Sequence, residues 1–496
     1  MPHYSKLLFL NINLKTQRGQ ALFALLLLLT IGASAAFYTL VRPAGSAIER
    51  DKITAAALAQ AKAALIGYAA GVSDFAGGER PGDLPCPDTN DSGNTGTSCG
   101  NAAGTTGQTS RIGRLPWKSL GLPDLRDGDG ERLWYAVSHN FKYNNRTSCI
   151  LVGQPGYFIG AEAGCLNSDS RGTITIRNSA GTVIHDGTNP DPFTPSGVIA
   201  VIFAPGAVLQ RQGAGAAQDR SCTGGSCTAA GACTSSPLTN TPKCNPVNYL
   251  DVLSGVEDNA GFTDSSATDG FINGVIRDAN NNVIVNDRLI TITYNDLMPV
   301  LQRRVAKEVL NCLGAYAIAN NGRYPWAVPA SSSSYADLVD VRFGRIPDGS
   351  PTNLLTATFG TAPTMADRWP SSGTECNMIR NAGWNNWKEL VFYGVANAYK
   401  PVSGLPVGGP CDGTSATCLR VNPPSAAYDK RVVVVVAGKR LSVSAYPAGN
   451  NQPRTSPADK QDPNNYLEGQ NNNTPTSNIY EQPSISASFS DFLLYQ

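Results

Sequence analysis

The pattern of apolar and polar positions begins with one long apolar run. Residues 21–41 contain no charged side chain, and at ~1.5 Å rise per residue they would form a helix about 31 Å long. That length matches the hydrocarbon core of a bilayer. Lys6, Lys15 and Arg18 precede the run without an acidic residue. The positive-inside bias therefore predicts that this end stays in the cytoplasm and that the remainder is exported.

A second pattern, typical of an amphipathic helix, follows directly. Residues 45–70 are rich in alanine and place Ile53, Leu58 and Leu65 on one apolar stripe. The two segments together predict one helix of about fifty residues with a kink at Pro43. A cleaved secretory signal is the alternative interpretation, and Ala33-Ser34-Ala35 would provide its cleavage site.

The remaining pattern predicts one more long helix, two shorter helices and several strands. The long helix starts near Asp296 as its N-cap, with Pro299 in the first turn and an apolar series behind it at Leu301, Val305, Val309 and Leu313. Shorter helices are expected at 133–141 and 387–395. Residues 173–177 and 182–185 predict a hairpin, 198–204 and 432–437 predict buried strands, and 289–294 alternate like a half-buried strand.

Short blocks recur in the same order along the chain, which indicates an internal repeat. The matched blocks are 65–69 with 313–317, 113–116 with 344–347, 133–137 with 391–395, 198–204 with 432–437, 245–251 with 462–468, and 290–296 with 485–491. We therefore expect two copies of one module, at 45–295 and 296–496. Each copy starts with a helix and continues with antiparallel strands, so the predicted fold class is α+β, with disulfide-stapled loops, after a long N-terminal membrane-spanning helix.

Composition and charge narrow the class of protein. Charged residues make up 16% of the chain, while Gly numbers 50 and Pro 33, which favours a loop-rich extracytoplasmic surface. The formal net charge is only +1, so a nucleic-acid partner is not expected.

The 12 cysteines favour disulfide bonds in an oxidising compartment, because only three histidines accompany them and no zinc-type ligand set can be assembled. Free buried thiols are the alternative. Spacing suggests four local bridges: Cys86 with Cys99, Cys149 with Cys165, Cys233 with Cys244, and Cys411 with Cys418.

The amino terminus resembles a known family. Residues 17–23 read Gln-Arg-Gly-Gln-Ala-Leu-Phe and lead into the apolar run, which is similar to the prepilin leader and stem of type IV pilins and type II secretion pseudopilins. The resemblance implies a cytoplasmic leader at 1–19, a transmembrane stem at 20–44, cleavage after Gly19 by a prepilin peptidase, and methylation of Gln20. The fifth mature residue is Ala24, where this family usually has Glu. A signal anchor in which the Arg-Gly pair occurs by chance is the alternative.

Candidate chemistry is sparse. The histidines are His3, His139 and His185, and no motif of a hydrolase, a metalloprotease or a phosphate-binding loop is present, so we expect no enzyme. Asp88, Asn90 and Ser92 match the start of a calcium-binding loop, although Cys99 stands where the bidentate Glu belongs. A second acidic cluster comprises Asp124, Asp127, Asp129 and Glu131. Ordinary turn chemistry is the alternative at both places.

The leading functional hypothesis is a non-enzymatic minor pilin-like or pseudopilin-like subunit of a type IV pilus or type II secretion filament. Its partners would be other pilin or pseudopilin subunits, the prepilin peptidase and the inner membrane, with the body in the periplasm or outside the cell. Ala24 cannot neutralise a neighbouring stem's amino terminus, so a place at or near the filament tip is expected. The alternative is a membrane-anchored or pilus-borne adhesin.

Overall fold

The computed structural model of the chain describes residues 47–72, 80–96, 99, 111–142, 165–189, 195–212, 217–220, 245–262, 270–332, 335, 341–347, 374–380, 382–401, 411–442, 452–454, 456–472, 477–486 and 488–496. The predicted membrane run at 21–41 and the kink at Pro43 lie outside these residues. Contacts divide the chain into Met1–Asp51 and Lys52–Gln496, and the second unit contains the structure relevant to a functional site.

Helix α2 (Ala47–Gly71) confirms the predicted apolar stripe. Its buried positions Ala57, Leu58, Ala61, Leu65 and Ala69 belong to the main hydrophobic core. Residues Ile48–Gly71 are long and apolar enough to cross a membrane by length and composition alone. Because one face of the helix packs into the core, its apolar character has a structural explanation in the folded body.

The first four-stranded sheet has the order β1-β2-β5-β11, with every neighbouring pair antiparallel. Its strands are β1 (Ile112–Arg114), β2 (Trp134–Val137), β5 (Ala200–Ala204) and β11 (Arg288–Ile292). Tyr135 and Ile202 join the core that contains α2, whereas Trp134 and Phe203 join a second core on the other face. Both faces of β5 are buried, which explains why its sequence is continuously apolar instead of alternating.

Smaller sheets lie around this second core. The sheet β4-β3-β8 contains β3 (Thr175–Arg177), β4 (Val183–His185) and β8 (Gly270–Ile272), and the two-stranded sheets pair β6 (Val252–Leu253) with β7 (Glu257–Asp258) and β9 (Ile276–Arg277) with β10 (Val283–Val285). Strands β3 and β4 are antiparallel, so the predicted hairpin is confirmed. Ile176 and Phe271 supply buried side chains to the second core.

The N-cap of helix α3 (Tyr294–Ala319) lies three residues earlier than the sequence predicts. Thr293 is the N-cap, and the carboxylate of Asp296 accepts a hydrogen bond of 2.8 Å from the Thr293 backbone N–H. Asp296 is therefore the third residue of a capping box and not the N-cap. The apolar series that includes Leu301 and Leu313 is buried as predicted.

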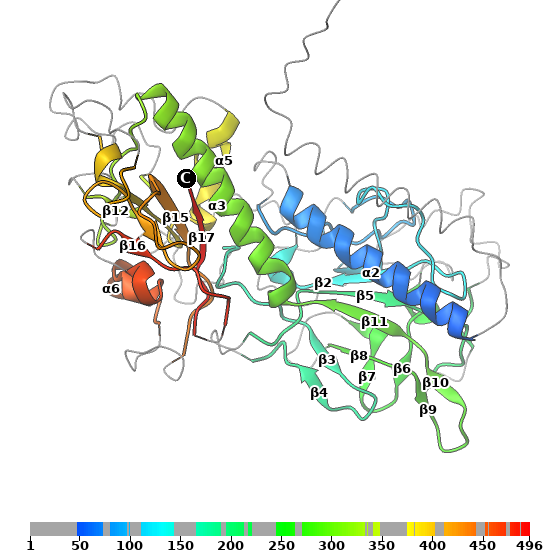
Figure 1. Cartoon of the computed structure of the whole chain (residues 1–496). Helices are drawn as coiled ribbons and strands as arrows, with labels where there is room; N and C mark the ends of the chain where they lie inside the picture. Colours follow the sequence, from blue (N-terminus) through cyan, green and yellow to red (C-terminus); the bar gives the residue numbers. More distant parts are fainter. Residues whose placement is uncertain are drawn as a thin grey trace, which may run out of the picture. The chain divides into compact units, whose positions relative to one another are not determined.

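The second four-stranded sheet has the order β12-β13-β15-β17 and is also antiparallel throughout. Its strands are β12 (Phe343–Arg345), β13 (Val391–Val395), β15 (Val432–Val436) and β17 (Phe492–Tyr495). Helix α3 contacts β15 and β17, as Figure 1 shows in green beside the orange and red strands. The remaining elements are the parallel pair β14 (Arg420–Val421) and β16 (Ile479–Tyr480) and the short helices α5 (Asn377–Arg380) and α6 (Pro457–Gln461).

The prediction of short helices at 133–141 and 387–395 is wrong, because β2 and β13 are strands inside these segments. Residues four apart share a face in a strand as well as in a helix, so the spacing of Leu133, Val137 and Phe141 does not distinguish the two. Aromatic and β-branched side chains that are buried on both faces favour the strand.

Three of the six matched sequence blocks lie at corresponding strands of the two sheets, in β1 and β12, β2 and β13, and β5 and β15. The match of 290–296 with 485–491 is wrong. The strand that pairs with β15 is β17, which starts after Asp491, just as β11 starts after Asp287. The described residues thus form an α+β structure with two similarly ordered sheets.

Candidate functional site

The most elaborate polar arrangement of the described residues surrounds two arginines. In the first, Arg220 donates from Nε to the carbonyl of Asn248 at 2.8 Å and from Nη1 to the carbonyl of Gly206 at 2.6 Å. Its Nη2 donates to Gln218 Oε1 at 2.7 Å and to the carbonyl of Tyr249 at 3.3 Å. The guanidinium also lies 4.9 Å from the centre of the Tyr249 ring. Backbone oxygens and an aromatic face therefore enclose this cation.

The same contacts recur around Arg454. Its Nε donates to the carbonyl of Asn465 at 2.6 Å, its Nη1 to Gly438 at 3.1 Å, and its Nη2 to Gln452 Oε1 and the carbonyl of Tyr466, both at 3.5 Å. Its guanidinium lies 4.6 Å from the centre of the Tyr466 ring. Each partner has a counterpart around Arg220, so the two arginines occupy matching environments beside the two four-stranded sheets.

A second matched pair explains the recurring Gly-Arg dipeptide. Arg114 in β1 lies 4.5 Å from the centre of the Tyr249 ring, and Arg345 in β12 lies 5.0 Å from that of Tyr466. A Cβ at the preceding residue, Gly113 or Gly344, would overlap a backbone carbonyl of the segment that passes beside the strand. Glycine is therefore required for close approach of the backbone, and arginine for stacking.

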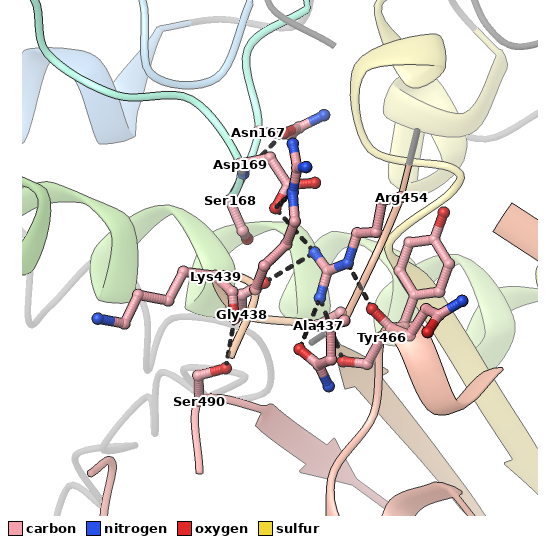
Figure 2. Close-up of polar contacts among 12 residues, drawn as sticks. Asn167, Ser168, Asp169, Ala437, Gly438, Lys439, Arg454, Tyr466 and Ser490 are labelled. Carbon is pink, nitrogen blue, oxygen red and sulfur yellow. Dashed lines mark hydrogen bonds and ion pairs between the residues drawn. The ribbon is translucent and has the colours of Figure 1, made fainter. Parts of the chain in front are cut away.

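The two environments differ in the carboxylate that neutralises the arginine. Arg220 lies 3.5 Å from Glu131, whose side chain is 28% exposed. The corresponding Glu389 instead binds Lys460 at 2.7 Å. Arg454 is neutralised by Asp169, which lies 2.9 Å from its Nη1 and 3.5 Å from Arg440 Nε (Figure 2).

Asp169 belongs to a segment before β3, far from Arg454 in sequence, and neighbouring contacts hold that segment in place. The Leu166 backbone N–H donates to Asn386 Oδ1 and Asn167 Nδ2 donates to the Asn386 carbonyl, both at 2.8 Å. The Tyr294 hydroxyl donates to the carbonyl of Ser168 at 2.8 Å. These contacts fasten the segment to the part of the chain that carries the second sheet. The segment between residues 165 and 171 is thus a junction, named the Asp169 junction below.

Electrostatics stabilise the ionised form of Asp169. Its side chain is 7% exposed, and burial alone would raise the pKa of this carboxyl. The positive charges of Arg454 and Arg440 outweigh burial and hold the pKa below its ordinary value. The junction is therefore a buried ion cluster, in which the Asp169 carboxylate faces both Arg454 and Arg440.

The predicted calcium loop has the contacts of a turn. Asp88 Oδ1 accepts from the backbone N–H groups of Asn90 and Ser92, and Asp88 Oδ2 accepts from that of Gly93 at 2.6 Å. Asn90 Oδ1 and Ser92 Oγ accept further backbone N–H groups within the loop. The oxygens that would ligate calcium thus organise the loop itself, which matches the turn alternative.

The carboxylates of the second acidic cluster also have partners within the protein. Asp124 pairs with Arg126 and Arg132, each at 2.8 Å, and Asp127 accepts backbone N–H groups from Asp129, Glu131 and Gly206. Across the described ranges, no group of three or more His, Cys, Asp or Glu side chains is placed to hold a metal ion.

The two histidines within the described residues make local contacts. His139 Nδ1 lies 3.2 Å from the Thr173 hydroxyl, and His185 Nδ1 lies 3.2 Å from the carbonyl of Ser196. These are contacts to residues that lie before β3 and before β5, outside the strands.

Three disulfides are formed among the described cysteines. Cys86–Cys99 and Cys411–Cys418 were both predicted from spacing. Cys312–Cys376, which joins α3 to the segment before α5, was missed because its sequence separation is 64. Cys165 is disulfide-bonded, but its predicted partner Cys149 and the predicted pair Cys233 and Cys244 lie outside the described residues.

The predicted processing residues Gly19 and Gln20, and Ala24 in the stem, also lie outside the described residues. The Asp169 junction was not predicted at all. The matched arginine environments had a signal in the sequence, since Asn248-Tyr249 and Asn465-Tyr466 belong to one of the recurring blocks.

Comparison with known proteins adds no relative. The chain matches no protein-family model, no curated protein and no solved structure.

Proposed function

We propose that this chain is a non-enzymatic, prepilin-like minor subunit whose body is a pair of related α+β modules. The observation that carries the proposal is the Arg18-Gly19-Gln20 motif directly before an uncharged run at 21–41. A positively charged segment before an uncharged apolar helix is the order expected of an exported protein with a membrane stem, and the Arg-Gly-Gln sequence between them resembles a prepilin cleavage site.

The body supports an extracytoplasmic location. Disulfides persist in oxidising compartments and are rare in the cytosol, and three join described cysteines. The apolar stripe of α2 lies in the same core as β2 and β5. A helix that emerges from the membrane and then packs on a sheet would fix the stem to the body.

The duplication is part of the proposal. Two sheets share the same antiparallel strand order, and Arg220 and Arg454 have matching partners. Two modules that arose from one would inherit both features. A subunit with two modules is too bulky to pack closely in a repeating filament, which favours a place at or near the tip.

Processing of the leader tests the proposal. Co-expression with a prepilin peptidase should yield a mature chain that begins at Gln20 with a methylated amino terminus, as read by mass spectrometry of the N-terminal peptide. Gly19→Leu should block this cleavage, whereas Gly32→Leu, a glycine within the apolar run, should leave it intact. Cleavage next to Ala35 without the peptidase would instead identify an ordinary secreted protein.

A pilus-borne adhesin is the second candidate function, and it is compatible with the same processing. The long loops rich in Gly, Thr, Ser and Asn favour it. Loss of surface attachment with unchanged filament assembly, after deletion of the gene, would support adhesion over assembly.

A further inference from the structure

Each module buries a pair of carboxyl groups that neither the ion clusters nor the proposed function explains. In the first, the Asp251 backbone N–H donates to Asp287 Oδ2 at 2.7 Å, and the Asp287 backbone N–H donates to Asp251 Oδ2 at 3.2 Å. The two side chains thus cap each other's backbone, and this reciprocal arrangement brings their carboxyl groups together. Both residues are almost completely buried, at 1% and 0% exposure.

The second module repeats the arrangement with Glu468 and Asp491. The Glu468 backbone N–H donates to Asp491 Oδ2, and the Asp491 backbone N–H donates to Glu468 Oε2, both at 3.0 Å. These residues are 2% and 1% exposed. A matching amide donates to each pair, from Asn259 to Asp287 at 2.8 Å and from Asn471 to Asp491 at 3.0 Å.

The surroundings leave each pair short of positive charge. Gln218 and Gln452 donate neutral amide hydrogens to Asp251 and Glu468. Among the described residues, Arg220 acts on the first pair and Arg454 on Glu468 of the second, and these arginines are already paired with Glu131 and Asp169. Tyr294 also lies within electrostatic range of Glu468.

Among the described residues, one oxygen in each pair accepts no hydrogen bond from an N–H or hydroxyl donor. These oxygens are Oδ1 of Asp287 and Oδ1 of Asp491. Two ionised carboxylates in contact repel each other, and an ionised oxygen that is buried without a donor carries the full cost of desolvation. A proton on one carboxyl of each pair removes both costs.

We propose that each carboxyl pair is a proton-binding site that retains one proton at neutral pH and thereby holds the last strand of its sheet in place. Asp287 directly precedes β11 and Asp491 directly precedes β17. Their partners Asp251 and Glu468 follow the short helical turns Pro246–Asn248 and Pro463–Asn465. The protonated pair is thus a latch between each turn and the final strand, and it works whether or not the chain is a filament subunit.

The sign of the pH effect follows from the environment. Burial raises the pKa of Asp251 to about 6, and burial together with the charge of Asp251 raises the pKa of Asp287 well above its ordinary value. Burial also raises the pKa of Glu468 and Asp491. The folded state therefore binds protons that the unfolded state has released. Stability is fully present below the ordinary carboxyl pKa of about 4, and it is lost as pH rises through the higher folded values.

Hydrogen exchange of the full chain in detergent tests the two latches separately. Mass spectrometry of peptides that cover β11 and β17 would follow their opening between about pH 5 and pH 8, after correction for the intrinsic exchange rate. For wild type we expect the opening constant of each strand to rise by up to about tenfold per pH unit within the titration range, which corresponds to one retained proton. Asp287→Asn should flatten the profile of β11 only, and Asp491→Asn that of β17 only.

Asp278→Asn is the matched control, because Asp278 is an exposed carboxylate that caps the β9–β10 turn. It should leave both profiles unchanged. Wild-type profiles without a pH slope, or slopes that persist in the two Asn variants, would overturn the proposal. If the variants fail to fold, the infrared spectrum of the wild type decides. A protonated carboxyl band at neutral pH that disappears on unfolding supports the latch, and its absence refutes it.

Discussion

The arginine environment beside the first sheet takes its carboxylate from the same half of the chain. The matching environment beside the second sheet takes its carboxylate from the other half. Arg220 is neutralised by Glu131, a residue that precedes β2 of the same sheet. Arg454 is neutralised by Asp169, at a sequence separation of 285. The backbone carbonyls that surround the arginine are alike in both places. Whether the arginine depends on another region of the chain is decided by the residue that supplies the carboxylate.

Because of this difference, the environment of Arg454 depends on the Asp169 junction. The second sheet cannot neutralise Arg454 with its own Glu389, because that side chain binds Lys460. The ion pair between Asp169 and Arg454 (Figure 2) and the hydrogen bond from the Tyr294 hydroxyl to the Ser168 carbonyl hold the two parts of the chain together. We therefore expect substitution of Arg454 to destabilise both parts of the chain, and substitution of Arg220 to destabilise mainly the first.

Replacement of the two arginines should give the largest contrast. Arg454→Met leaves the buried Asp169 with only the longer ion pair to Arg440 among the described residues, and we expect it to lower the free energy of unfolding by about 3–5 kcal/mol, as for a broken buried ion pair. Arg220→Met should cost only about 1–3 kcal/mol, since Glu131 can turn toward water. Urea unfolding of the two variants measures both losses, and equal losses would contradict the contrast.

Removal of disulfides should sharpen the comparison at a smaller scale. Cys312–Cys376 closes a separation of 64 in the second part of the chain, whereas Cys86–Cys99 closes 13 in the first. Loop-closure entropy predicts losses of about 4 and about 3 kcal/mol for the paired Ala variants. Cys411–Cys418, with a separation of 7, is the internal control, with an expected loss of about 2 kcal/mol. Thermal unfolding under oxidising conditions should rank the three in this order, and any other order would argue against a loop-entropy origin.

A further prediction depends on pH. Asp169→Asn keeps an acceptor for Arg454 but removes the charge, so we expect a loss of about 2 kcal/mol at neutral pH. Because the pKa of Asp169 is lowered in the folded state, its contribution is present above the ordinary value of about 4 and is lost as pH falls through the folded value. Wild type and variant should therefore converge in acid when urea unfolding is repeated there.

Glu131→Gln is the matched variant in the first environment. It should cost less than about 1 kcal/mol, because the ion pair is long and partly exposed. A loss at Glu131 as large as that at Asp169 would show that the two carboxylates are equivalent after all.

Features that depend on neighbouring residues were predictable from the sequence. The apolar faces of α2 and α3, the buried strands β5 and β15, the β3–β4 hairpin and the two short-range disulfides all follow from residues within a few turns or one loop. Local spacing determines which side chains share a face, and short loops bring cysteines together without help from the rest of the fold.

Features that depend on the path of the whole chain were decided only by tertiary structure. Segment 133–137 became a strand because β1 and β5 flank it on both sides, although its spacing also fits a helix. Asp169 and Arg454, Cys312 and Cys376, and the two carboxyl pairs meet across long separations. These contacts require the packed elements around them to be in place, because a charge or a thiol meets a distant partner only where packing brings the two backbones together.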